Sequence, residues 1–121
     1  MTLESLEKSI VWKKSYTLTL NIYRTINTFP SNEEYGLKSQ IRRSSVSIPS
    51  NIAEGLLRSS KKEFSHFSSI ARGSAGELMT QIMLSEDLGY ISKEKASEIK
   101  QELSEIIRIL YAIIKTIRNH S

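Results

Sequence analysis

The histidines and their acidic neighbours are the side chains of this sequence best suited to acid–base or metal chemistry. His66 follows Glu63 by three residues, which is the spacing of one half of the di-iron site found in ferritin-like bundles. Such a site needs a second Glu-x-x-His pair on another helix, and the sequence contains none. We therefore expect His66 and His120 to be solvated surface residues and expect no metal site.

Nucleophilic and phosphate-transfer chemistry is equally poorly represented. The segment Gly73-Ser74-Ala75-Gly76 lacks the Gly-x-Ser-x-Gly spacing of a nucleophile elbow. No glycine-rich phosphate-binding loop is present, and there is no cysteine to form a disulfide or a thiolate metal site. The sequence thus predicts a protein that is not an enzyme and needs no cofactor or small-molecule substrate.

Basic residues form the one cluster with a plausible binding chemistry. The formal net charge is +4 and the pI is near 9.4, a mild excess that suits a nucleic-acid partner but is also common on other proteins. Charged helix faces often serve only to keep a protein solvated, and that alternative stays open. The candidate nucleic-acid-binding residues are Arg42, Arg43, Arg58, Lys61, Lys62 and Arg72. Arg72 could instead pair with a carboxylate, either Glu54 or Glu77.

Helical periodicity is found throughout the sequence, and the alternation typical of strands is absent. We expect four helices: residues 9–29, residues 34–58, a third that starts after Ser59 or Ser60 and extends to about residue 88, and residues 92–118. The short connections favour an all-α fold, an antiparallel up-down-up-down four-helix bundle. Residues 1–121 would form a single domain, with residues 1–8 and 119–121 frayed.

Local signals place the ends of these helices. Phe29-Pro30 should stop the first helix, because the residue before proline disfavours the α conformation. Asn32 or Ser31 can cap the second, and Ser60 with Glu63 forms a capping box for the third. The third helix should end at Gly89, and the fourth should begin at Ser92.

Pro49 lies inside the predicted second helix and should kink it. Proline removes the hydrogen bond to the carbonyl of Ser45, and the hydroxyls of Ser44, Ser45 and Ser47 could satisfy the backbone groups that are freed.

A polar line runs beside the apolar stripe of the second helix. Its members are Gln40, Ser44, Ser47, Asn51 and Glu54. For Asn51 and Glu54 we expect a buried structural network at a helix–helix seam, with a solvent border or a ligand site as the alternatives.

The first and fourth helices carry more apolar surface than one packing face requires. In each, the apolar residues span roughly 200° of the helix, about twice the arc that a surface helix buries. The first helix owes its width to a second line, formed by Trp12, Tyr16, Leu20 and Tyr23. We expect this surface to mediate self-association. Burial of both helices inside an irregular bundle is the alternative.

Location is predicted from what the sequence lacks. No apolar run approaches the roughly 18 residues that span a bilayer, and the first residues do not resemble a signal peptide. We expect a cytoplasmic protein without membrane contact.

Several motifs together resemble a known family. They are RRSSVSIPSNIAEG at residues 42–55, KKEF at 61–64, ARGS at 71–74 and EL at 77–78. The pattern is similar to that of the four-helix-bundle proteins encoded in intervening sequences of bacterial 23S rRNA genes. Trp12, the Phe29-Pro30 stop and the segment LGYI at residues 88–91 fit it as well. The resemblance covers residues 10–118.

The resemblance implies an antiparallel four-helix bundle without catalytic activity that assembles as a ring-like homopentamer. It also implies a relation to the accessory proteins of diversity-generating retroelements, which share the fold and bind nucleic acid and a reverse transcriptase. Two functions follow as expectations. The first is a non-enzymatic oligomeric module that binds nucleic acid, most simply structured RNA. The alternative is a homo-oligomeric scaffold that recruits a partner enzyme acting on nucleic acid.

Overall fold

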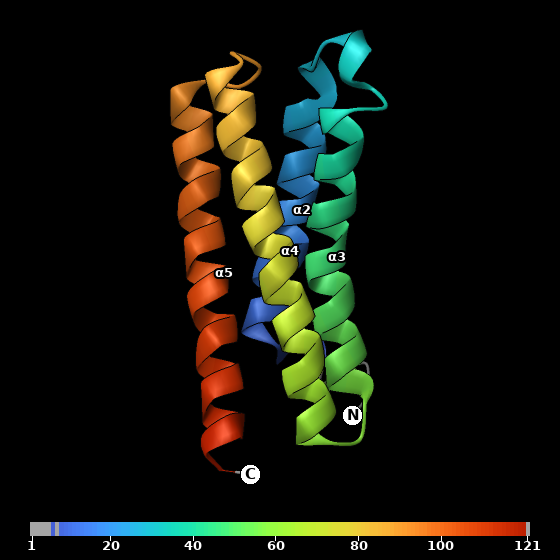
Figure 1. Cartoon of the computed structure of the whole chain (residues 1–121), viewed down its shortest axis with the longest axis vertical. Helices are drawn as coiled ribbons and strands as arrows, with labels where there is room; N and C mark the ends of the chain where they lie inside the picture. The colour runs from blue at the N-terminus through green and yellow to red at the C-terminus, as the bar shows by residue number, and fades with distance from the viewer. Residues whose placement is uncertain (1–5, 7, 121) are drawn as a thin grey trace.

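The protein is an antiparallel bundle of four long helices, as the sequence predicts. The computed structural model describes residue 6 and residues 8–120. The four helices are α2 (Ile10–Thr25), α3 (Leu37–Leu57), α4 (Lys61–Asp87) and α5 (Lys93–Asn119). They alternate in direction, so the α2–α3 and α4–α5 connections lie at one end and the α3–α4 connection lies at the other (Figure 1). No strand occurs among the described residues.

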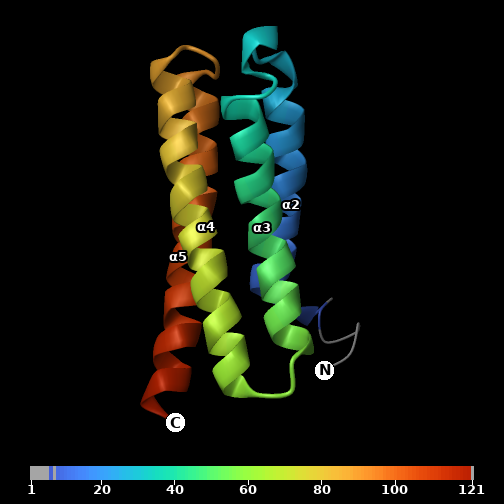
Figure 2. The same ribbon diagram turned by 45° about the vertical axis from the view of Figure 1, so that its right-hand side comes forward.

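The packing between helices is uneven. Helix α3 packs most extensively on α4, and α4 packs on α5, whereas α2 packs less extensively on α5 than on α3. The view in Figure 2 shows the α3–α4 pair in front, with the start of α2 and the end of α5 toward the α3–α4 connection. Ion pairing and hydrogen bonding supplement the weaker seam: Lys14 pairs with Glu105 at 2.9 Å, and Lys95 donates to Asn21 at 2.9 Å.

The α2–α3 connection differs from the prediction in two places. Helix α2 ends at Thr25, and a 3-10 turn, η1 (Ile26–Thr28), leads to the extended Phe29. Helix α3 begins at Leu37 and not near residue 34, because a second 3-10 turn, η2 (Ser31–Glu33), takes up Ser31 and Asn32. Neither of these two caps α3. A carboxylate oxygen of Glu33 accepts the hydrogen bond from the Leu37 amide at 3.0 Å instead.

The predicted caps of the last two helices are confirmed. The amide of Glu63 donates to the hydroxyl of Ser60 at 3.1 Å, and the amide of Lys95 donates to the hydroxyl of Ser92 at 3.1 Å. Gly89 has φ +79° and follows the last residues of α4, with the amide of Tyr90 bonded to the carbonyl of Ser85 at 2.8 Å. This is a Schellman ending, for which glycine is the favoured residue.

The core is formed by one stripe from each helix. Its fully buried large side chains are Leu18, Ile22, Ile26, Ile41, Ile48, Ile52, Leu78, Ile82, Ile99, Leu103, Ile106 and Leu110. The alternation of three and four along α5 predicts one buried stripe, made up of Ala96, Ile99, Leu103, Ile106, Leu110, Ile113 and Ile117. That stripe is buried as far as Leu110, but beyond it Ile114 is buried, while Ile113 and Ile117 are only half-buried. A regular three-four repeat drifts around a helix of 3.6 residues per turn, and that drift shifts the buried position by one residue.

The carbonyl freed by Pro49 is satisfied from outside its own helix. Helix α3 continues through Pro49. The hydroxyl of Thr19 on α2 shares its proton between the carbonyl oxygens of Ser15, at 2.8 Å, and Ser45, at 3.0 Å. We expected serine hydroxyls of the same helix to bond to the freed backbone groups. For the carbonyl of Ser45 that expectation was wrong, because the donor is Thr19 on α2. The hydroxyl of Ser45 instead donates to the carbonyl of Arg42 at 3.0 Å, and the hydroxyl of Ser44 donates to the side chain of Gln81 on α4 at 2.6 Å. The kink itself stays a prediction.

The chain ends differ in how they meet the bundle. Leu6 is buried against the core, and the other predicted frayed positions 1–5, 7 and 121 lie outside the described residues. Asn119 is the last residue of α5, and an imidazole nitrogen of His120 lies 2.8 Å from the carbonyl oxygen of Thr116. Within the described part of the chain, no helix is both long and apolar enough to cross a bilayer.

Candidate nucleic-acid interface

A polar seam joins α3 to α4, and it contains most of the polar line predicted from the sequence. Ser44 donates to the side-chain oxygen of Gln81 at 2.6 Å, and the hydroxyls of Ser47 and Ser74 lie 2.8 Å apart. The amide nitrogen of Asn51 donates to the Ser47 hydroxyl at 2.9 Å and to the Ser47 carbonyl at 2.8 Å. The predicted network therefore exists at Asn51, which is half-buried.

Glu54 does not belong to that network. Its side chain is 48% exposed, and it accepts hydrogen bonds from Nε and Nη2 of Arg58, the former at 3.1 Å. The prediction of burial was wrong because Glu54 lies at the outer edge of the polar line, on the side that faces solvent. The hydrogen bonds that Arg58 donates to the Glu54 carboxylate raise the pKa of the Arg58 guanidinium above its usual value.

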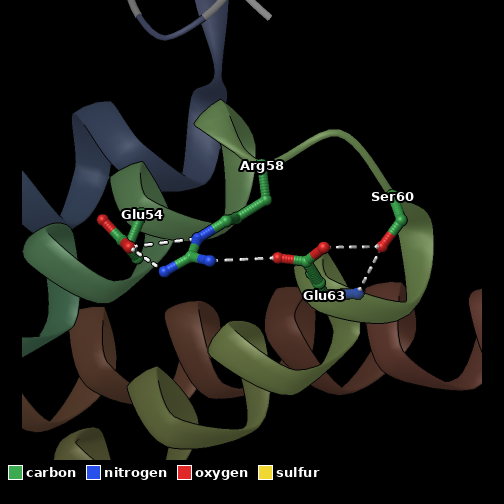
Figure 3. A network of polar contacts seen from close by, with 4 residues as sticks. All are labelled: Glu54, Arg58, Ser60 and Glu63. Atoms are coloured by element: carbon green, nitrogen blue, oxygen red, sulfur yellow. Dashed lines mark hydrogen bonds and ion pairs between the residues drawn. The ribbon is translucent and has the colours of Figure 1, made fainter.

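Figure 3 shows that Arg58 links the end of α3 to the start of α4. Its guanidinium also pairs with Glu63 at 3.3 Å, and Glu63 in turn lies beside the capping hydroxyl of Ser60. On its other side Arg58 lies over the ring of Phe67, 5.1 Å from the ring centroid. The first role of this candidate residue is therefore to close the α3–α4 connection, and two carboxylates offset its charge.

Arg42 is similarly engaged at the opposite end of the bundle. Its guanidinium pairs with Glu34 at 2.9 Å, and Lys38 reaches the other oxygen of the same carboxylate at 3.1 Å. These two hydrogen bonds, that from Arg42 foremost, lower the pKa of Glu34 below its usual value. Arg43, the next residue, is exposed and lines a shallow groove of about 390 Å³ over the polar seam.

The six candidate basic residues do not form one continuous patch. Arg42 and Arg43 lie on the first half of α3, while Arg58 follows its last turn. At a rise of about 1.5 Å per residue, the two groups are separated by roughly 23 Å along the bundle. Lys61 and Lys62 are exposed at the start of α4, close to Arg58, and Arg72 is exposed further along the same helix.

Arg72 pairs with neither of the two carboxylates considered for it. Its guanidinium lies over the ring of Tyr111 on α5, 5.0 Å from the ring centroid. The partner could not be identified from the sequence, because it comes from a different helix and is aromatic rather than acidic. A guanidinium stacked on an aromatic face keeps its charge and its planar surface.

Charge is distributed unevenly along the bundle. We define the basic end as residues 8–17, 48–74 and 105–120, which lie beyond the helix midpoints toward the α3–α4 connection. This end carries ten Lys and Arg against three Glu. The described remainder, residues 18–47 and 75–104, carries seven Lys and Arg against eight Asp and Glu. The modest overall charge therefore conceals a strongly positive end.

Helix α5 contributes to this end, which the prediction from the sequence missed. Arg108 and Lys115 are exposed on α5 and lie three residues before and four residues after Tyr111, so all three share one helix face. A signal for them exists in the sequence, since residues 106–120 contain three basic residues and no acidic one. The regular apolar stripe of the same segment masks that signal.

The histidines lie apart from any candidate metal ligand set. His66 is exposed on α4 and meets the ring of Phe67 edge-on, with ring centroids 5.1 Å apart. No group of three or more His, Cys, Asp or Glu that could hold a metal ion occurs in the part of the chain that the structure describes.

Comparison with known proteins agrees with this architecture. The sequence matches the family described as 23S rRNA-intervening sequence protein over residues 7–112. A comparison with curated proteins gave no match. Among solved structures, the chain is similar to a protein of unknown function from the S23 ribosomal protein family of Bacteroides thetaiotaomicron.

That similarity extends over nearly the whole of both chains. The sequences are 29% identical, the aligned region covers 88% of this chain and 99% of the other, and the TM-score is 0.79. Neither the family description nor the name of the solved structure mentions a catalytic activity. With the four-helix architecture and a family match over most of its length, this chain belongs to the 23S rRNA-intervening sequence protein family.

Proposed function

We propose that this protein is a non-enzymatic module of the cytoplasm that binds structured RNA through its basic end. The observation that carries the proposal is the excess of ten basic over three acidic residues at that end. Lys and Arg side chains that neutralise phosphates release condensed counterions, and this supplies most of the affinity of sequence-independent binding. The name of the family, which refers to 23S rRNA, favours RNA over DNA.

The six basic residues predicted from the sequence contribute unequally in this proposal. Lys61, Lys62 and Arg72 are exposed on the basic end and no carboxylate among the described residues pairs with them. They make the main phosphate contacts. Arg58 belongs to the same end, but RNA would have to compete with its carboxylate partners. Arg42 and Arg43 provide a secondary contact about 23 Å away.

Self-association is the second part of the proposal. On α2 the outer apolar line stays at the surface: Tyr16 is 49% exposed, Leu20 43% and Tyr23 41%. The corresponding surplus on α5 is mostly taken up inside the bundle, since Ile107 and Ile109 are half-buried and Ile114 is buried. We propose that α2 packs against a second copy in a closed ring, for which five copies are the first choice. Such a ring would repeat the basic end and multiply its phosphate contacts.

Light scattering after size exclusion tests the assembly. The expected mass is several times the 13.8 kDa of one chain. Replacing Tyr16 and Leu20 with serine should release monomers that keep their helical circular dichroism signal. A wild-type protein that stays monomeric at tens of micromolar would refute this part of the proposal.

Filter binding to a structured RNA at about 50 and 200 mM salt tests the RNA interaction. Replacing Lys61, Lys62 and Arg72 with serine should weaken binding at the lower salt and reduce the salt slope by about one for each phosphate that is no longer neutralised. The control replaces Arg24 and Lys93 with serine, two exposed basic residues outside the basic end to which no RNA contact is assigned. Absence of binding at the lower salt, or an equal loss per replaced residue in the two variants, would contradict the proposal.

A scaffold that recruits a nucleic-acid enzyme is the second candidate function. The exposed apolar line of α2 favours it, because the same surface could receive a partner protein in place of another copy. Co-purification separates the two candidates. A scaffold retains its partner protein after nuclease treatment and high salt, whereas the RNA-binding module retains nothing once the RNA is digested.

A further inference from the structure

The Arg72–Tyr111 pair is an exposed aromatic feature of the basic end. Tyr111 is 50% exposed, and the guanidinium of Arg72 lies over its ring at 5.0 Å from the centroid. Arg72 comes from α4 and Tyr111 from α5, so the pair bridges the two helices. Contact with the ring restrains the guanidinium, and because Arg72 is exposed its planar group can receive a further flat group.

The surroundings of the pair are positive. Arg108 and Lys115 flank Tyr111 on the same face of α5. No hydrogen bond or ion pair to another described residue engages either of them. On α4 no acidic residue occurs between Glu63 and Glu77, and residues 106–120 contain none. A phosphate group could therefore approach the pair without meeting a carboxylate.

The surface of α4 beside Arg72 is unusually bare. Gly76 lies one turn after Arg72, and a Cβ atom added there would find no heavy atom within 4 Å. The same holds for Gly73. Glycine within a helix is destabilising relative to alanine, and the packing of this bundle does not require it at either position. The two glycines leave room for a ligand backbone to lie close to the helix.

We propose that this face recognises an unpaired nucleotide of a folded RNA. The base stacks on the Arg72–Tyr111 pair, while Arg108 and Lys115 hold the neighbouring phosphates and the sugar passes over Gly76. This inference rests on the RNA-binding function proposed above and specifies which part of an RNA the basic end would receive. Proteins read RNA at loops and bulges in this way, because only unpaired bases offer a free face to an aromatic or guanidinium plane.

Three RNA probes test the inference: a hairpin with an oligoadenosine loop, the same hairpin with abasic loop nucleotides, and the fully paired duplex. All three present phosphates, but only the first offers unpaired bases. Wild-type protein at low salt should bind the adenosine hairpin about tenfold more tightly than the abasic hairpin or the duplex, as expected for one stacked base.

Variants of Arg72 and Tyr111 test whether the preference for the adenosine hairpin comes from a base stacked on this pair. Tyr111→Ala should remove the preference for the adenosine hairpin over the abasic hairpin, whereas Tyr111→Phe should retain that preference. Arg72→Lys keeps the charge but loses the plane, so it should also reduce the preference. Tyr35→Ala is the matched control, because Tyr35 is 97% exposed but lies in the α2–α3 connection, at the opposite end of the bundle.

The outcomes separate this inference from the function on which it rests. Equal, salt-dependent binding of all three probes would overturn the stacking site and leave RNA binding in place. An equal loss of affinity for every probe in Tyr111→Ala would also overturn it, because that pattern indicates a structural defect or a purely electrostatic role. Failure to bind any probe at low salt would overturn both proposals.

Discussion

Replacing Gly55 with alanine should destabilise the bundle, although alanine is normally the better helix residue. Gly55 lies in the last turns of α3, where that helix packs closely against the start of α4. A Cβ atom at this position would lie 3.0 Å from Cδ1 of Phe64 and 3.0 Å from Cβ of Phe67. Ordinary separations between carbon atoms are about 3.5–4.0 Å, so α3 and α4 would have to move apart by some tenths of an ångström.

The expected magnitude follows from two opposing effects. Overpacking a well-filled site costs about 1–3 kcal/mol, and the Cβ of Phe67 cannot relieve it by a rotamer change because it is fixed to the α4 backbone. Against this, alanine within a helix gains about 1 kcal/mol over glycine. The net loss of stability should therefore be at most about 2 kcal/mol. A domain of this size would lose about 4 °C in Tm for each kcal/mol.

Thermal unfolding followed by circular dichroism, at one fixed protein concentration, measures the effect. Gly73→Ala is the matched control, because a Cβ atom there meets nothing within 4 Å and the substitution should raise the Tm. If Gly55→Ala raised the Tm as much as the control does, the close approach of α3 and α4 at this point would be refuted.

Further predictions concern single polar groups of the bundle. Thr19→Val should destabilise the fold by about 1–3 kcal/mol, because it leaves the buried carbonyl of Ser45 without a partner. In a Pro49→Ala variant, the amide N–H of residue 49 can bond to the carbonyl of Ser45. Urea denaturation should therefore show that Thr19→Val lowers stability less in that variant than in the wild-type protein. Ser68→Ala should be neutral or stabilise by about 1 kcal/mol, because the buried Ser68 hydroxyl has no partner among the described residues. Arg42 and Lys38 hold the pKa of Glu34 below its ordinary value. Their ion pairs with Glu34 therefore stabilise the fold fully at a pH above that ordinary value, and this stabilisation is lost as the pH falls through the lowered pKa. Acid unfolding followed from about pH 5 to about pH 2 should consequently be less steep for Glu34→Gln.

The arrangement of the candidate basic residues could be predicted only in part, and their role in binding stays a prediction. The sequence identified Lys61, Lys62 and Arg72 as exposed basic residues on one helix, and they are. We also grouped Arg42 and Arg43 with them, because these arginines are close in the sequence to Lys61 and Lys62 and closeness in sequence was taken to mean closeness in space. A helix of this length separates them by roughly 23 Å. The contribution of α5 was overlooked because its basic residues are distant in the sequence from the other candidates.

The sequence alone determined the number of helices, most of their ends and most of the core. These features depend on local properties, namely the 3.6-residue period of apolar side chains and the capping chemistry of Ser60, Gly89 and Ser92. It did not determine the start of α3. There a 3-10 turn takes up the two predicted capping residues, and the carboxylate of Glu33 accepts the hydrogen bond from the amide of Leu37, four residues later.

Only the tertiary structure decided which groups meet across the bundle. Thr19 reaches the carbonyl freed by Pro49, and the guanidinium of Arg72 lies over the ring of Tyr111. Each of these pairs joins two helices, and its members meet because the helices are packed at a particular relative height. That height is set by the fit of the whole core rather than by any local pattern, so a periodicity read from one helix carries no information about it.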